Sequence, residues 1–102
     1  MALIQAYNPS SGGGGAQAEW TTQNEVVTEA FSEGYAIILT DSGSGILPDT
    51  IIVNMMEKIL IRGSNYDYTF SAPNIITINF ADDPTQYANG QIIFQISYAY
   101  NA

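Results

Sequence analysis

The stretch "QIIFQISYAY" (residues 91–100) decides the fold, because its side chains alternate with the two-residue period of a β-strand. One face of this predicted strand carries large apolar and aromatic side chains, those of Ile92, Phe94, Ile96, Tyr98 and Tyr100. The other face carries Ile93, Gln95, Ser97 and Ala99. The segment "NIITINF" (74–80) alternates in the same way. Two such strands near each other in the chain predict an all-β protein.

Further β-rich segments precede these two. They are "YAIILT" (35–40), "TIIVNMM" (50–56), "KILIR" (58–62) and "YDYTF" (66–70). Turn-forming sequences separate them, among them "DSGSG" (41–45), "RGSN" (62–65) and the longer "ADDPTQYANG" (81–90). Short strands with turns between them predict a small antiparallel β-sandwich or barrel, with its body over residues 20–102.

The segment before these strands carries mixed signals. Thr22 and Glu25 fit the capping box that begins many helices, and Gly34 is suited to end one. Val26 and Val27 also suit a strand. We predict a short helix or an irregular segment near residues 22–33, with a strand as the alternative.

Residues 1–19 are predicted to form an extended N-terminal arm. Pro9, two serines and the four glycines of 12–15 make a linker that would span ~15 Å as random coil. Its apolar side chains are those of Ala2, Leu3, Ile4 and Tyr7. We interpret these four residues as a partner-docking arm; the alternative is a disordered terminus.

The charge balance limits the partners of this chain. Ten acidic residues face only Lys58 and Arg62, which gives a net charge of −8. Nucleic acids and anionic membranes are recognised by clustered Lys and Arg, so we expect neither as a partner. We also expect no signal peptide and no segment that spans a bilayer.

The chain has few groups suited to catalysis. It contains no histidine and no cysteine, and its glycine run lacks the lysine of a phosphate-binding loop. Asp82 and Asp83 are candidates for a calcium site or a glycosidase pair, but we expect them to solvate the loop before Pro84. We therefore expect no catalytic, cofactor or metal site and no enzymatic activity.

Aromatic residues offer a binding alternative. Trp20, Tyr66, Tyr68, Tyr87, Tyr98 and Tyr100 would make a sugar-stacking face if they lay together. The simpler interpretation is that tyrosine is a good strand residue with one polar end.

Apolar residues also fall on the nominally polar faces of the predicted strands. Ile75 and Ile93 do so, and Ile52, Ile59 and Ile61 can do the same. Such residues need either a second packing layer or a partner subunit. We predict a homo-oligomer, a trimer or dimer, whose interface includes Ile75, Ile93, Tyr98 and Tyr100.

The stretch "IIVNMMEKILIRGSNYDYTFSAPNIITINFADDPTQYANGQIIFQISY" (51–98) has a recognisable order of residues. It resembles a β module of bacteriophage virion proteins, found in tail fibres, head fibres and decoration proteins. The matching positions are Asn54, Leu60, Asp67, Tyr68, Thr69, Ile76, Thr77, Ile78, Pro84, Gly90, Ile92 and Tyr98. The chain departs from the family pattern at Met55 and Gln91, and Gly63 comes two residues early with Asn65 in the usual glycine position.

The resemblance implies a non-enzymatic virion structural protein on the outer surface of the particle. A capsid-attached head fibre or decoration (auxiliary capsid) protein fits best, with its arm docked on the capsid or a neighbouring virion protein. The alternative is a carbohydrate- or receptor-binding module of a phage tail fibre or adaptor. Under either interpretation Gly63, Asn65, Asp67 and Tyr68 are scaffold residues.

Overall fold

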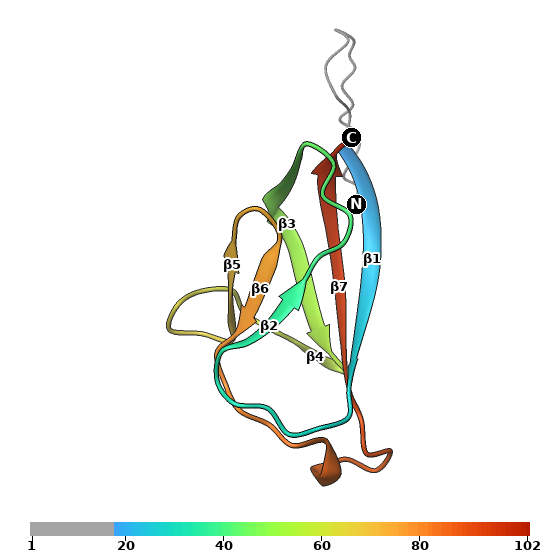
Figure 1. Ribbon diagram of the computed structural model, residues 1–102, viewed down its shortest axis with the longest axis vertical. Coiled ribbons are helices and arrows are strands. Elements are labelled where there is room, and N and C mark those ends of the chain that lie inside the picture. The colour runs from blue at the N-terminus through green and yellow to red at the C-terminus, as the bar shows by residue number, and fades with distance from the viewer. Residues whose placement is uncertain (1–17) are drawn as a thin grey trace, which may run out of the picture.

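The computed structural model describes residues 18–102. The predicted docking residues Ala2, Leu3, Ile4 and Tyr7 lie outside this range. The fold is all-β, as predicted: two antiparallel sheets pack on each other as a β-sandwich (Figure 1). Among the described residues, no helix is long and apolar enough to cross a membrane.

The larger sheet has four strands in the order β1-β7-β3-β4, and the smaller has three in the order β2-β6-β5. The strands of the larger sheet are β1 (Ala18–Val27), β7 (Ile92–Asn101), β3 (Gly45–Met55) and β4 (Lys58–Ile59). Those of the smaller are β2 (Tyr35–Ile38), β6 (Ile75–Ile78) and β5 (Tyr68–Ser71). A 3-10 turn, η1 (Pro84–Gln86), interrupts the connection from β6 to β7.

Strand β7 is the centre of the larger sheet and supplies much of the core. Phe94, Ile96 and Tyr98 are fully buried on the apolar face of this strand. The small sheet contributes Ile76 and Ile78 from β6, which are also fully buried. The inward positions of both sheets therefore form one apolar core.

The prediction of a helix near residues 22–33 is wrong, because residues 18–27 form strand β1. This strand pairs antiparallel with β7 along its whole length, from Ala18 opposite Asn101 to Val27 opposite Ile92. Glu25, expected in a capping box, instead accepts a 2.7 Å hydrogen bond from the Tyr35 hydroxyl. The pairing edge that β7 offers outweighs local helix signals, since each residue of β1 gains a long-range partner.

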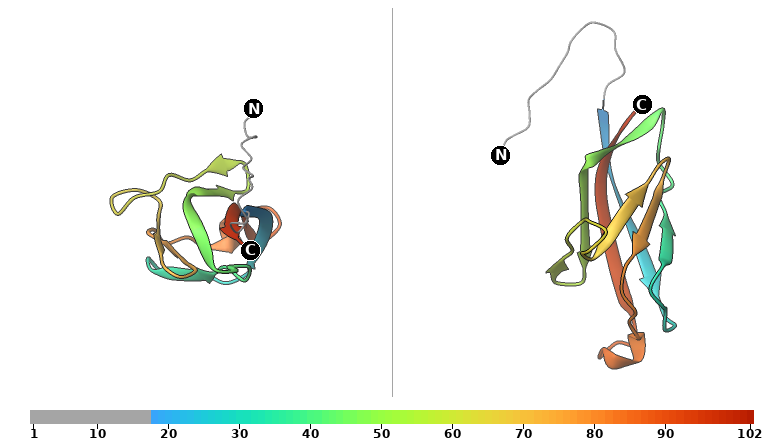
Figure 2. Two further views of the ribbon diagram at one scale, coloured as in Figure 1. Left: turned by 90° about the horizontal axis from the view of Figure 1, so that it is seen from above. Right: turned by 90° about the vertical axis from the view of Figure 1, so that its left-hand side faces the viewer.

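Side-chain and loop contacts join the two sheets at their edges. The Gln23 amide of β1 donates to the Ile38 carbonyl at 2.8 Å and accepts from the Thr40 backbone N–H at 2.9 Å. On the opposite side, the Ile61 N–H donates to the Asp67 carboxylate at 2.8 Å, just before β5. Seen from above, the strands surround a common core (Figure 2). Gln23 thus links the two sheets along one edge, and the β4–β5 connection with its Ile61–Asp67 hydrogen bond closes the other.

Strand β3 begins earlier than the sequence predicts. It starts at Gly45, and its pairing with β7 shifts register between Leu47 and Ile52, which is where Pro48 lies. It ends in a two-residue turn of Met56 and Glu57, with Met56 at a φ of 56°. The strand predicted at 58–62 is correspondingly short, since only Lys58 and Ile59 pair with β3.

Candidate interaction surface

The larger sheet has one face that the small sheet does not cover. We call this the outer face and define it by the strand positions that alternate with the buried ones. Its residues lie in cross-strand rows, which are Trp20–Ala99–Leu47, Thr22–Ser97–Ile52, Asn24–Gln95–Asn54–Ile59 and Val26–Ile93.

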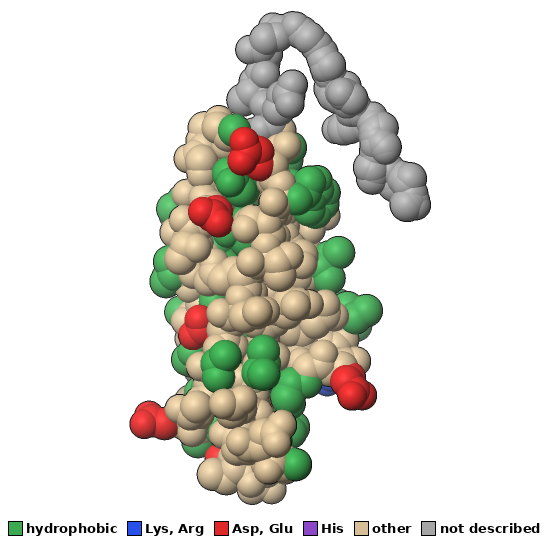
Figure 3. Space-filling view, turned by 90° about the vertical axis from the view of Figure 1, so that its right-hand side faces the viewer, with side chains coloured by type: hydrophobic (Ala, Val, Ile, Leu, Met, Phe, Trp, Pro, Cys, Tyr) green, Lys and Arg blue, Asp and Glu red, His purple; other side chains and the backbone are tan. Residues whose placement is uncertain are grey.

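Large apolar side chains on the outer face stay exposed to solvent. Trp20 is 62% exposed and Ile59 is 68% exposed, and Val26, Ile52 and Ile93 are exposed as well. Viewed from the side of β1, green side chains stand out from a largely tan surface (Figure 3). The second sheet of the sandwich therefore does not cover the surplus apolar residues that the sequence shows.

The outer face also carries no charge. None of the ten acidic or two basic residues of the chain occupies a position in its rows. Glu19 and Glu25 lie on the opposite side of β1, where they accept hydrogen bonds from Tyr100 and Tyr35. Arg62 donates to the Asp49 carboxylate at 2.9 Å. The paired rows are therefore uncharged, while β3 and β4 still carry Asp49, in the bulge between Leu47 and Ile52, and Lys58, opposite Met55.

The four residues predicted as an oligomer interface do not lie together. Ile93 is on the outer face and 37% exposed. Ile75 is half-buried on the small sheet, opposite Ile38. Tyr100 is half-buried on the inward side of β7.

Tyr98 corrects the prediction most clearly. Its side chain is fully buried within this subunit, so it is not available for contact with a second one. Its hydroxyl accepts a hydrogen bond from the Asp41 backbone N–H at 3.1 Å. Burial raises the pKa of the Tyr98 hydroxyl. The residue is part of the core because β7 turns that face toward the small sheet.

Sequence reasoning missed the part of the outer face that β1 contributes. Trp20, Asn24 and Val26 belong to it only because residues 18–27 form a strand, and the sequence favoured a helix there. Ile52 and Ile59 were recognised as surplus apolar residues. The signal that would have found the β1 residues is the composition of "WTTQNEVV" (20–27), in which Trp, Thr and Val are residue types favoured in strands.

The tyrosines do not form one stacking face. Tyr68 is buried, with its hydroxyl 3.5 Å from the Ile51 carbonyl, and burial raises its pKa. Tyr66 is 61% exposed in the loop before β5. Tyr35 lies against Glu25, and its burial together with that carboxylate raises its pKa to about 12. Within residues 18–102, the most exposed aromatic rings are those of Trp20 and Tyr66.

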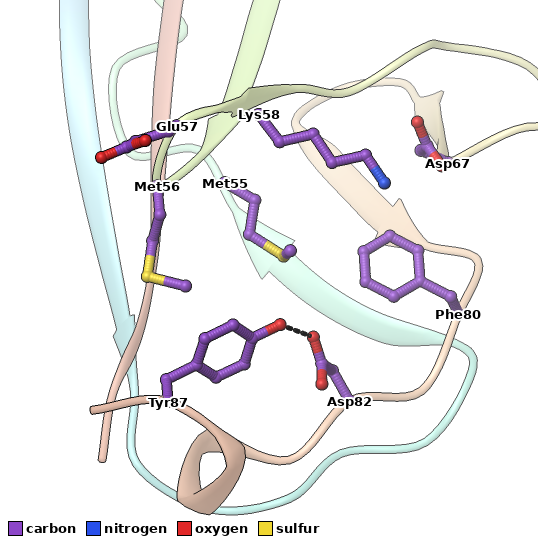
Figure 4. A pocket seen from close by; sticks show the side chains of 8 residues that line it. All are labelled: Met55, Met56, Glu57, Lys58, Asp67, Phe80, Asp82 and Tyr87. Carbon is purple, nitrogen blue, oxygen red and sulfur yellow. Dashed lines mark hydrogen bonds between the residues drawn. The ribbon is translucent and has the colours of Figure 1, made fainter. Parts of the chain in front are cut away.

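An open cleft of about 780 Å³ lies beside the turn between β3 and β4. Its lining consists of Met55, Met56, Glu57, Lys58, Asp67, Phe80, Asp82 and Tyr87. Lys58 reaches across it toward Asp67, and Tyr87 points toward Asp82 (Figure 4).

Asp82 and Asp83 both have hydrogen-bonding roles within their loop. The Tyr87 hydroxyl donates to Asp82 at 2.6 Å, and this bond is the main reason that the pKa of Tyr87 is raised. Asp83 caps η1 by accepting from the Thr85 N–H at 3.0 Å. Within residues 18–102 no group of three or more acidic residues is placed to hold a metal ion.

Asp67 and Gly63 stabilise the loop before β5. Asp67 and Ile61 exchange two hydrogen bonds, one through the Asp67 carboxylate and one from the Asp67 N–H to the Ile61 carbonyl at 2.8 Å. Gly63 has a φ of 148°, and the Tyr66 ring lies where a Cβ atom would stand. These residues build the scaffold.

Comparison of the chain with known protein families, curated proteins and solved structures gave no match. The class of protein is therefore defined by its own geometry, as a two-sheet β-sandwich with an exposed, uncharged outer sheet face.

Proposed function

We propose that this chain is a non-enzymatic virion structural protein, a capsid-attached head fibre or decoration protein of a bacteriophage. Its β-sandwich body forms a homo-oligomer, a trimer or dimer, and its N-terminal arm docks on the capsid or a neighbouring virion protein. It lies on the outer surface of the particle. The resemblance of residues 51–98 to the phage β module supports the virion assignment.

The observation that carries the structural role is the outer face. Several large apolar side chains left in water on one face of a sheet often mark a site of contact with another protein. Here Trp20, Val26, Ile52, Ile59 and Ile93 are all exposed on one sheet. A subunit contact would remove these side chains from water, as expected for a protein that works as part of an assembly.

The remaining chemistry is consistent with a scaffold. The sequence has no histidine and no cysteine, and Asp82 and Asp83 are engaged in loop hydrogen bonds. The negative charge lies away from the outer face and would keep an assembled particle surface soluble.

Particle binding tests this proposal. The full chain and a variant that lacks residues 1–17 are added to phage particles produced without it, and bound protein is measured after co-sedimentation. The full chain should bind, and the truncated chain should remain folded but unbound. A variant with Leu3, Ile4 and Tyr7 replaced by serine controls for arm length and should also fail. Failure of the full chain to bind, or undiminished binding of the truncated chain, would contradict the proposal.

Exposed aromatic rings support one alternative, a carbohydrate- or receptor-binding module of a tail fibre or adaptor. Trp20 and Tyr66 are 62% and 61% exposed, and such rings can stack on sugars. Calorimetric titration with oligosaccharides should then show binding that is lost in Trp20→Ala or Tyr66→Ala. Binding that survives both substitutions would count against this function.

A further inference from the structure

We infer that the outer face packs against the same face of a second copy, with a two-fold axis that passes beside Gln95. The inference rests on the self-association in the proposed function and is independent of the virion assignment. It names the contact surface, the partner and the symmetry of the pair.

The charge distribution favours a second copy as the occupant. A basic partner would be drawn to carboxylates and an acidic partner to cations, and the rows of the outer face contain neither. Two copies that each carry a net charge of −8 repel, so they approach most easily through neutral surfaces. The broad face of β1, β7 and β3 meets this condition.

The polar groups of the face favour an identical partner even more strongly. Asn24, Gln95 and Asn54 stand side by side across three strands, with Gln95 in the middle. Each amide has both donors and acceptors, so an identical row can satisfy it. A wholly apolar partner would leave the three amides buried without hydrogen bonds.

The apolar groups surround this amide row. Trp20 stands toward one end of the face and Val26 and Ile93 toward the other, while Ile52 and Ile59 lie on β3 and β4. In an isologous contact, the residue on the axis faces its own copy and the surrounding groups meet one another. Gln95 is the middle residue of the amide row and lies on β7, between β1 and β3.

The flat area of the face is somewhat smaller than a stable contact uses, so protruding side chains have to supply the rest. Ten-residue strands are about 33 Å long and neighbouring strands lie about 4.8 Å apart. The three long strands β1, β7 and β3 therefore cover roughly 500 Å² of flat sheet, without the area that protruding side chains add. A stable interface uses about 800 Å² of accessible surface on each partner. The protruding side chains of Trp20 and the four aliphatic residues add accessible surface to this area.

Charge complementation at Gln95 tests the inference on the full chain. Gln95→Glu and Gln95→Lys each place two like charges opposite each other, and each should weaken dimerisation at least about 100-fold. An equimolar mixture of the two variants should dimerise again, because the two charges are then opposite. Sedimentation velocity measures the species, and thermal unfolding checks that each variant is folded. Ile59→Glu, at a position 68% exposed, is a second probe that leaves the core untouched and should also weaken the dimer.

Thr77→Glu and Thr77→Lys provide matched controls. Thr77 is half-buried at the centre of the small sheet, between Ala36 and Thr69, and its substitution should leave the dimer unchanged. The lysine variants add a further check. Both lysine variants reduce the net negative charge, so general repulsion between copies should fall in both. If Gln95→Lys loses association and Thr77→Lys does not, the loss reports a local contact at Gln95.

The outcomes separate this inference from the proposed function. A wild-type chain that stays monomeric overturns both the inference and the proposed self-association. If the wild-type chain is an oligomer and neither Gln95→Glu nor Ile59→Glu dissociates it, only the inference is overturned, because another surface then holds the subunits. A mixture that fails to recover, or a wild-type trimer, overturns the two-fold axis at Gln95. Recovery of a dimer in the mixture supports it.

Discussion

Gln23→Ala should destabilise the sandwich, because the Gln23 side chain joins β1 of the larger sheet to β2 of the smaller. Its amide donates to the Ile38 carbonyl at 2.8 Å and accepts from the Thr40 N–H at 2.9 Å. The Thr40 hydroxyl donates to the same oxygen at 3.2 Å. Alanine removes all three hydrogen bonds and leaves two backbone groups without a protein partner.

The size of the effect follows from the exposure of these groups. A hydrogen bond in a folded protein contributes about 0.5–1.5 kcal/mol net. Thr40 is exposed, so water can replace part of what is lost, and the lower half of that range applies. Three bonds then give about 2 kcal/mol. For a domain of this size, that lowers the melting temperature by roughly 8–16 °C.

Urea unfolding followed by circular dichroism, at one fixed low protein concentration, measures the change in the free energy of unfolding. Gln86→Ala is the matched control, because Gln86 is exposed in η1 and its side chain makes no hydrogen bond within the described residues. It should change stability by less than about 0.5 kcal/mol. If Gln23→Ala lowers the free energy of unfolding by no more than the control does, the idea that this amide holds the sheets together is refuted.

Two further predictions concern alkaline stability and a loop glycine. Burial and Glu25 raise the pKa of Tyr35 from 10.0 to about 12, so the folded state favours the protonated hydroxyl. The contribution of this group to stability should be fully present below pH 10 and decrease from pH 10 to about 12. An ultraviolet titration of Glu25→Gln should show Tyr35 ionising at lower pH than in the wild-type chain. An unchanged titration in Glu25→Gln would show that the carboxylate does not act on Tyr35. Gly43→Ala should unfold at a lower urea concentration than Gly34→Ala. Both glycines have positive φ, but only at Gly43 would an added Cβ atom collide with the Asn101 carbonyl oxygen. This collision should lower the free energy of unfolding by about 1–3 kcal/mol more. Equal midpoints for the two variants would contradict this.

The sequence alone identified most of the strands. The alternation in residues 91–100 and 74–80 correctly predicted which side chains enter the core, because the period of a strand is fixed by its backbone. Gly63, interpreted as a scaffold residue, has a positive φ that suits the turn. Strand ends were less accurate: β3 begins at Gly45 and β4 is only two residues long, since pairing partners and not propensity set these limits.

The candidate surface was predictable only in part. Ile52, Ile59 and Ile93 were recognised as apolar residues in excess of what one core needs. Their neighbours Trp20, Asn24 and Val26 were not, because local signals favoured a helix near Thr22 and Glu25. A hydrogen-bonding edge more than sixty residues away along the chain decided otherwise.

The sequence by itself determined the two-residue alternation, the surplus of isoleucine and the excess of acidic over basic residues, because these depend only on the order and identity of the residues. The tertiary structure alone decided that residues 18–27 join β7, that Tyr98 is enclosed while Trp20 is exposed, and that three amides meet in one row. Those outcomes depend on which distant segments pair and in which register, and a register shift of one residue would exchange the two faces of a strand.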